Sequence, residues 1–522
     1  MVASWWLSWQ ADVSLSASDG QAVVAGSSAR VVLRPLAPEI IAALERLTPP
    51  GEEEERLSES ILAAGSVDSL ARWHYHVNQL RQRGLIRRTL YADGRPLATF
   101  SPLCRTPKSS TRPGSIAPGS IAPGSNPPVS KHGALTANTQ RHDGNGAHGS
   151  ESVVATAFVL SRFACIRREG DTLIVESPLA HARVILEDPR VMPILGALAA
   201  PATMSQLTAD SGDLAPADIQ AFLSLLQEAK MVDQVMADPA SGRQSSGLQD
   251  DAALATWEFH DLLFHSRSRR GRSGGRFGGT YRFADRPPPP ALKPPADRKG
   301  IDLYRPDPAQ LERDDPPLAL VQQRRRSIRS YGKVPVTARE LGEFLFRVGR
   351  VTKHNEFEAQ TPSGPIKMDF TSRPYPAGGG LYELEFYAAV RACTDLEAGL
   401  YHYDPEQHRL ESLSGPNGDC GSLLEDAALS AGIAADSLQV LVILTARFAR
   451  LAWKYESIAY SLILKDVGVV LQTMYLAATA MNLAPCALGC GDSDLFARAA
   501  ETDYFAETSV GEFLLGSIDV LT

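Results

Sequence analysis

A run of Pro, Gly and Ser between residues 105 and 150 constrains the fold most, because it interrupts the chain. It contains the near-repeat PGSIAPGSIAPGSNPP, followed by a stretch rich in Gly, Asn, His and Ser. Such a composition buries too little apolar area to offset the entropy lost on ordering. We therefore expect residues 105–152 to be a flexible linker between folded units. With 522 residues, 44% of them apolar, the chain can form several cores.

The segment before this linker, residues 1–104, predicts a winged-helix-like unit. Short alternating strands around Asp19-Gly20 are followed by three helical stretches, and then by LIRRTLYADGRPLATF, which predicts a hairpin turning at Asp93-Gly94. The order of three helices and a hairpin is typical of a winged helix.

Residues 153–240 read as a weaker copy of the first unit. A hairpin, FACIRREGDTLIVES, is followed by helical runs near Pro193 to Leu198 and Ala215 to Ala229. Two winged-helix-like units in tandem are therefore expected. Winged helices commonly bind DNA, but the last helix of the second copy is acidic and would repel phosphate.

Residues 241–316 are expected to be a basic, Pro-rich connecting segment. Between residues 265 and 300 there are ten Lys or Arg against two acidic residues. Three interleaved aromatic residues, Phe277, Tyr281 and Phe283, allow for a segment that packs. Residues 317–522 then mix helical and strand patterns over about 200 residues, which indicates an α+β domain.

Composition and targeting signals narrow the function. The net charge is -8, and acidic and basic residues are well mixed along the chain. The protein therefore has no overall positive charge that would attract nucleic acid or anionic lipid. The N-terminus lacks the pattern of a secretory signal, and the apolar stretch 469–490 reads as a buried helix rather than a membrane span. Six cysteines form neither a disulfide framework nor a zinc pattern, so no metal is expected. A cytoplasmic protein with no membrane or nucleic-acid partner is the expectation.

Three stretches of the expected C-terminal domain, residues 317–522, contain residues that could bind a cofactor. RRRSIRSY, residues 324–331, offers four arginines and two serines, the donors that a phosphate group prefers. SRPYPAGGGLYELEFY, residues 372–387, has glycines that let the backbone approach a flat ligand. Residues 452–489 place a Lys-Tyr pair at the head of a long predicted helix that ends in a turn of small residues.

These motifs, in this order, resemble those of the SagB-type (thiazoline/oxazoline, cyanobactin-oxidase-like) peptide dehydrogenases of the nitroreductase superfamily. The pattern is R-R-S-x-R, then R-P-x-P-x-x-G-G, then W-K-Y before the long helix; WEFHDLLFHSRSRRGR at 257–272 is also similar to longer members. The resemblance implies an α+β fold with a C-terminal nitroreductase-like FMN domain preceded by the two winged-helix-like units.

The same resemblance assigns roles to individual residues. Lys454 and Tyr455 correspond to the catalytic pair, and where many members have a serine in the glycine loop this chain has Ala377. The expected cofactor is FMN, and the implied contacts to its phosphate, ribityl chain and ring are Arg325, Arg326, Ser327, Arg329, Pro376, Ala377, Gly378, Gly379, Gln472, Cys486, Ala487, Leu488 and Gly489.

The function implied is an FMN-dependent azoline dehydrogenase (oxidase) that converts peptide thiazolines or oxazolines to thiazoles or oxazoles during ribosomal peptide (RiPP) biosynthesis. The expected partners are a second copy in a homodimer, an azoline-containing precursor peptide and a cyclodehydratase. One alternative is an NAD(P)H-dependent reductase of a small molecule with the same fold, and another is a winged-helix DNA-binding redox regulator. If Lys454 and Tyr455 are adjacent on a helix, they point about 100° apart, so the sequence leaves open which is the base.

Overall fold

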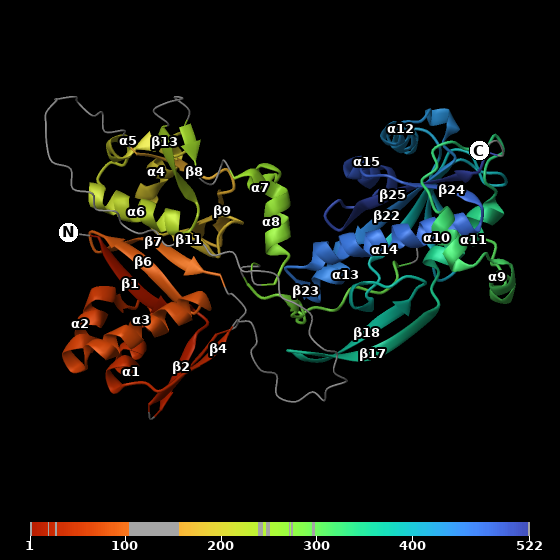
Figure 1. Ribbon diagram of the computed structural model, residues 1–522. Coiled ribbons are helices and arrows are strands. Elements are labelled where there is room, and N and C mark those ends of the chain that lie inside the picture. Colours follow the sequence, from red (N-terminus) through yellow and green to blue (C-terminus); the bar gives the residue numbers. More distant parts are fainter. Residues whose placement is uncertain are drawn as a thin grey trace, which may run out of the picture. The chain divides into compact units, whose positions relative to one another are not determined.

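The computed structural model describes residues 3–18, 20–26, 29–103, 156–237, 244–246, 251–270, 272, 275–294 and 298–519. These residues form two compact units, Met1–Ser266 and Arg267–Thr522 (Figure 1). The expected linker, 105–152, lies outside the described residues. Each unit has its own apolar core, so each is considered by itself.

The N-terminal unit is built on a seven-stranded sheet in the order β5-β1-β6-β7-β11-β10-β9. Helices α1 to α3 bury Trp73, Ile40 and Ile61 against Leu7 of the sheet. The elements of this half are β1 (Ser4–Trp9), β2 (Ser14–Ser18), β3 (Gln21–Ala25), β4 (Arg30–Leu33), α1 (Pro38–Glu45), β5 (Glu52–Glu53), α2 (Glu54–Ala64), α3 (Val67–Gln82), β6 (Ile86–Ala92) and β7 (Arg95–Pro102).

The second half of this unit shares the sheet of the first half. Strand β7 pairs with β11 from Pro102 opposite Ala182 to Ala98 opposite Leu186, so the two expected winged units are joined edge to edge. A further sheet, β12-β8-β13-β14, and helices α4 to α6 complete this half. Its elements are β8 (Ala157–Leu160), β9 (Cys165–Glu169), β10 (Thr172–Glu176), β11 (Ala182–Leu186), α4 (Met192–Ala197), β12 (Ala202–Thr203), α5 (Met204–Asp210), α6 (Pro216–Glu228), β13 (Val232–Ala237) and β14 (Gln244–Ser246).

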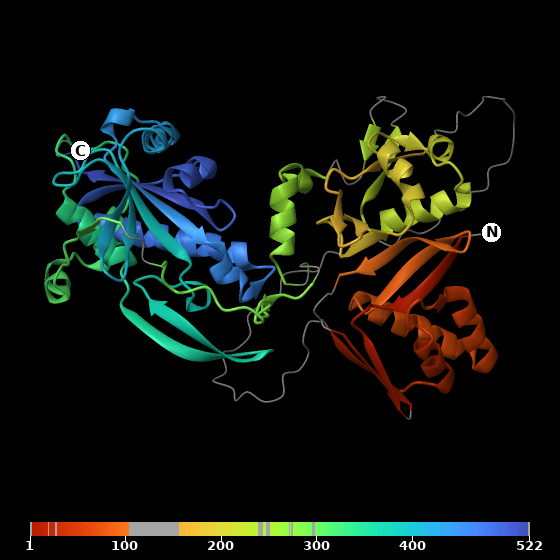
Figure 2. The same cartoon turned by 180° about the vertical axis from the view of Figure 1, so that it is seen from behind.

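The C-terminal unit is a seven-stranded antiparallel sheet, β16-β21-β20-β19-β22-β25-β24, covered by helices on both faces. Successive residues of β19 face opposite sides, because side chains alternate along a strand. Phe386 and Ala388 join the core that contains α11 and α14, whereas Tyr387 and Ala389 join the core that contains α12 and α15. Figures 1 and 2 show α14 lying along one side of this sheet.

The elements of the C-terminal unit begin in the connecting segment. After α7 (Ala252–Ala255) and α8 (Phe259–Arg267) come β15 (Gly278–Gly279), β16 (Gly300–Asp302), α9 (Pro308–Asp314), α10 (Leu318–Arg324), α11 (Ala338–Gly349), β17 (Lys353–Thr361), β18 (Gly364–Ser372), β19 (Leu384–Val390), β20 (Gly399–Asp404), β21 (Arg409–Ser414), α12 (Asp419–Ala431), β22 (Val440–Arg447), α13 (Phe448–Ala452), β23 (Tyr455–Glu456), α14 (Ala459–Ala480), β24 (Leu483–Ala487), α15 (Ser493–Ala500) and β25 (Glu507–Ser517).

The expected connecting segment 241–316 does not behave as one linker. Its residues from Arg267 onward belong to the C-terminal unit, and β16 forms the edge of the C-terminal sheet by pairing with β21. The basic composition does not indicate this packing, because it uses backbone carbonyl groups and the aromatic residues Tyr281 and Phe283 rather than a periodic apolar pattern.

Helix α14 is long and apolar enough to cross a membrane by length and composition alone. One face of it, however, packs in the core of the C-terminal unit through Ile463, Val467, Val470 and Met474. The sequence predicts a buried helix within 469–490, whereas the structure has a helix that ends at Ala480 and is buried on one face.

Candidate functional site

The arginine segment, residues 324–331, lies beside β24. The Ile328 amide donates a hydrogen bond of 2.8 Å to the Pro485 carbonyl. The hydroxyl groups of Ser327 and Tyr475 lie 2.6 Å apart, and the Tyr475 oxygen also accepts the Ala487 amide at 2.9 Å. One tyrosine of α14 therefore ties the arginine segment to the turn that follows β24.

The arginines of this segment are available to an anion. Arg326 and Arg329 are exposed, and among the described residues neither is paired with a carboxylate. Arg325 is half-buried, with its guanidinium 5.2 Å from the centre of the Tyr475 ring. Guanidinium groups without an acidic partner, next to a serine hydroxyl and a backbone turn, fit a phosphate group.

The glycine loop, residues 376–380, meets the lysine-tyrosine pair. Gly379 has φ +63°, in the left-handed region that favours glycine. A Cβ atom at Gly379 would lie 2.4 Å from the Tyr455 hydroxyl and 3.0 Å from the Lys454 amine, so a side chain there would displace the two groups. Both reactive groups therefore reach the same short piece of loop backbone.

The interpretation of Lys454 and Tyr455 as neighbours on the long helix is wrong. Helix α14 begins at Ala459, and Tyr455 lies in the short strand β23. Ser457 has φ +67°, a left-handed conformation that a right-handed helix cannot include. The pair is held by a turn and a strand, and the 100° argument does not apply.

Burial changes the ionisation of the two side chains in opposite senses. It lowers the pKa of Lys454, because desolvation disfavours the ammonium form. It raises the pKa of Tyr455, and the nearby Tyr281 and Asp466 raise it further. Lys454 thus loses its proton more readily than an ordinary lysine, whereas Tyr455 holds its proton more firmly than an ordinary tyrosine.

Two buried carboxyl groups, those of Asp466 and Glu383, lie next to the glycine loop, and one of them holds it by a hydrogen bond. Asp466 of α14 accepts the Gly378 amide at 2.7 Å, and its carboxyl group also meets that of Glu383, which is fully buried. Burial and the adjacent Asp466 raise the pKa of Glu383 to about 8. Two such groups are stable together when one holds a proton.

These contacts show which expected residues come together. The arginine segment adjoins the end of β24, where Cys486 and Ala487 belong to the strand rather than to the expected turn. Gly379 adjoins Lys454 and Tyr455. Gln472 is exposed on α14 between the two groups. Sequence reasoning missed Tyr475, Asp466 and Glu383; a polar residue recurring inside an apolar helix was the available signal for the first two.

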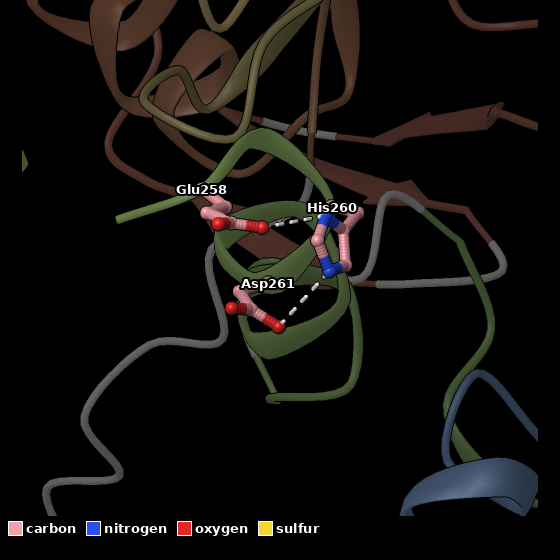
Figure 3. A group of neighbouring side chains, drawn as sticks. All are labelled: Glu258, His260 and Asp261. Carbon is pink, nitrogen blue, oxygen red and sulfur yellow. Dashed lines mark ion pairs between the residues drawn. The ribbon is translucent and has the colours of Figure 1, made fainter. Parts of the chain in front are cut away.

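A separate acidic cluster lies at the start of α8. Figure 3 shows Glu258, His260 and Asp261, with the imidazole nitrogens 3.5 Å and 3.6 Å from the two carboxylates. Their ligand atoms lie within 4.8 Å of one another, but all three side chains are exposed. Exposed ion pairs of this kind need no metal.

The Glu383–Asp466 pair makes a prediction about stability. Between its ordinary pKa and about 8, Glu383 keeps a proton that the unfolded chain would release, so this group lowers stability as pH rises through that window. Glu383→Gln removes the titration and keeps a polar side chain of similar size beside Asp466. We expect its stability relative to the parent to improve by about 3 kcal/mol between pH 5 and pH 8.

Thermal unfolding across that pH range checks this expectation. Glu312→Gln, at an exposed site on α9, is the matched control. Parallel pH profiles for Glu383→Gln and the parent would contradict the shared proton.

Comparison with known proteins agrees with this geometry. A model of the nitroreductase family matches residues 323–516, a model described as cyanobactin oxidase ThcOx matches 158–274, and a model of the ThcOx helix-turn-helix domain matches 1–110. The second winged half therefore falls largely within the cyanobactin oxidase match.

Individual relatives point the same way. The nitroreductase MJ1384 of Methanocaldococcus jannaschii is 30% identical over 189 residues, which span 36% of this chain and 84% of the relative. The trifolitoxin-processing protein TfxB of Rhizobium leguminosarum bv. trifolii is 29% identical over 110 residues, 21% of this chain and 30% of TfxB.

Among solved structures, the E. coli microcin synthetase McbBCD complex with truncated pro-MccB17 bound has 19% identity and a TM-score of 0.31, covering 50% of this chain and 92% of that one. Such a distant likeness decides nothing further. The family matches confirm the expected fold class, with an N-terminal helix-turn-helix domain and, at the C-terminal end, a nitroreductase domain. The chain belongs to the nitroreductase family of oxidoreductases, and its N-terminal part matches models described for the cyanobactin oxidase ThcOx.

Proposed function

We propose that this protein is an FMN-dependent oxidase that converts thiazolines or oxazolines of a ribosomal precursor peptide to the aromatic azoles. The observation that carries the proposal is the meeting of Lys454 and Tyr455 at Gly379, in a site whose other end presents unpaired arginines. A base beside a flat, phosphate-anchored redox group is what azoline oxidation requires.

The arginine segment and the glycine loop fit FMN, both in the groups they offer and in their separation along α14. Asp466, beneath the glycine loop, and Tyr475, beside the arginine segment, are nine residues apart on α14, about 14 Å along the helix axis. The arginine segment would hold the phosphate, and the glycine loop and the turn 486–489 would lie against the ring. When bound, FMN supplies the hydride acceptor that no protein side chain provides.

Lys454 is the group we assign as the base. Aromatising the ring removes a proton and a hydride from adjacent carbons. Neutral Lys454 takes the proton, since burial lowers its pKa toward working pH. Tyr455 stays protonated, so its hydroxyl orients the substrate through a hydrogen bond rather than removing a proton.

The substrate class rests on the relatives rather than on the site alone. The cyanobactin oxidase matches and the similarity to a trifolitoxin-processing protein support a modified peptide as the substrate. A cyclodehydratase partner and a cytoplasmic location are further parts of the proposal. The alternative of an NAD(P)H-dependent reductase is less favoured, because the N-terminal domain matches are to cyanobactin oxidases. A DNA-binding regulator is disfavoured by the same matches.

A homodimer is part of the proposal. Tyr460 and Leu464 of α14 are 47% and 41% exposed, and Gly468 and Gln472 continue the same face at four-residue spacing. An exposed apolar helix face of this kind suits a subunit interface. Light scattering should give twice 56.3 kDa, and a monomer mass at micromolar concentration would count against it.

Removing one arginine should weaken cofactor binding. Arg326→Ala is expected to reduce FMN affinity about tenfold, because one charge-assisted contact to the phosphate is lost. Fluorescence titration of the flavin-free protein measures this. Arg313→Ala, an exposed arginine on α9, should bind FMN like the parent. An unchanged affinity in Arg326→Ala would refute the phosphate assignment.

Substituting Lys454 or Tyr455 should impair azoline oxidation without impairing FMN binding. Lys454→Ala should keep its flavin and lose about 10²- to 10⁴-fold in azoline oxidation, the range for loss of a general base. Tyr455→Phe should also keep its flavin, with a smaller loss. Azole formation is followed by mass spectrometry on an azoline peptide, and Lys465→Ala on the exposed face of α14 is the control.

Undiminished azole formation in Lys454→Ala would exclude it as the base. Rapid bleaching of the flavin by NAD(P)H, with no azoline oxidation by the parent protein, would instead favour the reductase.

A further inference from the structure

A segment outside the nitroreductase match lies against the catalytic pair. Residues 275–294, here called the strap, fall between the cyanobactin oxidase match, which ends at 274, and the nitroreductase match, which begins at 323. The structure places the strap in the C-terminal unit. The strap contacts the segment that contains Lys454, which its basic, proline-rich composition does not indicate.

Two arginine side chains hold the C-terminal end of the strap, residues 289–291, through its backbone carbonyl groups. Arg450, 1% exposed, donates to the carbonyl groups of Leu381 at 2.9 Å and Asp369 at 2.8 Å, and also to that of Pro289. Arg447 donates to the carbonyl groups of Pro290 and Ala291. Charge-assisted bonds to a rigid proline-rich backbone hold this end in one place.

The near end of the strap pairs directly with the catalytic residues. Gly279 is the antiparallel partner of Tyr455, and the Tyr281 amide donates to the Lys454 carbonyl at 3.0 Å. The Tyr281 ring meets Trp453 edge to face, with centroids 5.7 Å apart. Both the backbone and the ring of Tyr281 are therefore fixed next to Lys454.

The Lys454 amine is enclosed on three sides. It lies 5.6 Å from the centre of the Tyr281 ring, 5.3 Å from that of the Tyr455 ring, and against the backbone of Gly379. Tyr455 and Gly379 belong to the region shared with nitroreductases, whereas the third wall comes from the strap.

We propose that Tyr281 is a positioning residue for Lys454, whose ring shields the amine from water and aims it at the substrate. This inference rests on the proposed function, in which Lys454 is the base. The strap then forms a wall of the substrate site. Removing the ring exposes the amine and returns Lys454 toward the behaviour of an ordinary surface lysine.

The other ionisable groups near Lys454 are engaged by other partners and do not shield its amine from water as the Tyr281 ring does. On β23, the Glu456 carboxylate accepts the Thr280 hydroxyl at 2.8 Å and lies 4.0 Å from Arg276 of the strap. On α14, Asp466 is engaged by Gly378 and Glu383. The lowered pKa of Lys454 has burial as its cause, and the Tyr281 ring is one of the groups that lie over the amine.

The test measures the ionisation of Lys454 without relying on turnover. The full-length, FMN-loaded protein is treated with an amine-acylating reagent at a series of pH values, and labelling of Lys454 is quantified by mass spectrometry. The pH midpoint reports ionisation, whereas the maximal rate also reports access. We expect Tyr281→Ala to raise the midpoint by about one pH unit, and Tyr281→Phe to leave it unchanged.

Phe283→Ala is the matched control, because Phe283 is an aromatic residue of the same strap that contacts Arg282 and Arg286 instead of Lys454. Its midpoint should equal that of the parent. Should Tyr281→Ala not fold, Tyr281→Thr takes its place, since threonine suits an extended segment. Lys465 in the same digest is an internal standard that should not shift.

Two results would overturn the inference: no midpoint shift on losing the Tyr281 ring, or an equal shift in Phe283→Ala, which would indicate general loosening of the strap. The proposed function fails separately, if the parent protein leaves azoline peptides unoxidised. Where oxidation occurs, the acidic limb of the kcat/KM profile should move with the labelling midpoint.

Discussion

The packing of α14 against the central sheet is the interaction on which the site depends. Its apolar face, including Val470 and Met474, is buried between strands and α11, which fixes the rotation of the helix about its axis. That rotation in turn places Asp466 under the glycine loop and Tyr475 beside the arginine segment. Cofactor-binding elements that are far apart in sequence are therefore positioned by one helix.

The reactive pair depends on a different constraint. Ser457 in a left-handed conformation ends the extended segment and separates Tyr455 from α14. The turn leaves Lys454 at the surface of the nitroreductase core, where a neighbouring segment is needed to keep water away. The strap lies against this turn and falls outside the region that the nitroreductase family matches.

The N-terminal unit shows how two similar halves are joined. Pairing between β7 and β11 gives one continuous sheet, which removes two exposed strand edges and their unpaired backbone groups. The result is a single body rather than two independent modules. A peptide or partner that binds there meets a surface shared by both halves.

The sequence by itself determined the order of domains, the strands and helices with strong periodicity, and the motifs that contain Arg325, Gly379 and Lys454. Those features are local, because hydrophobic period, turn residues and motif spacing are read along the chain. Tertiary structure alone decided where α14 begins, that Glu383 and Asp466 meet, and that Tyr281 covers Lys454. Contacts between distant segments depend on how sheets and helices pack, and a basic, proline-rich composition does not indicate the buried carbonyl bonds that anchor the strap.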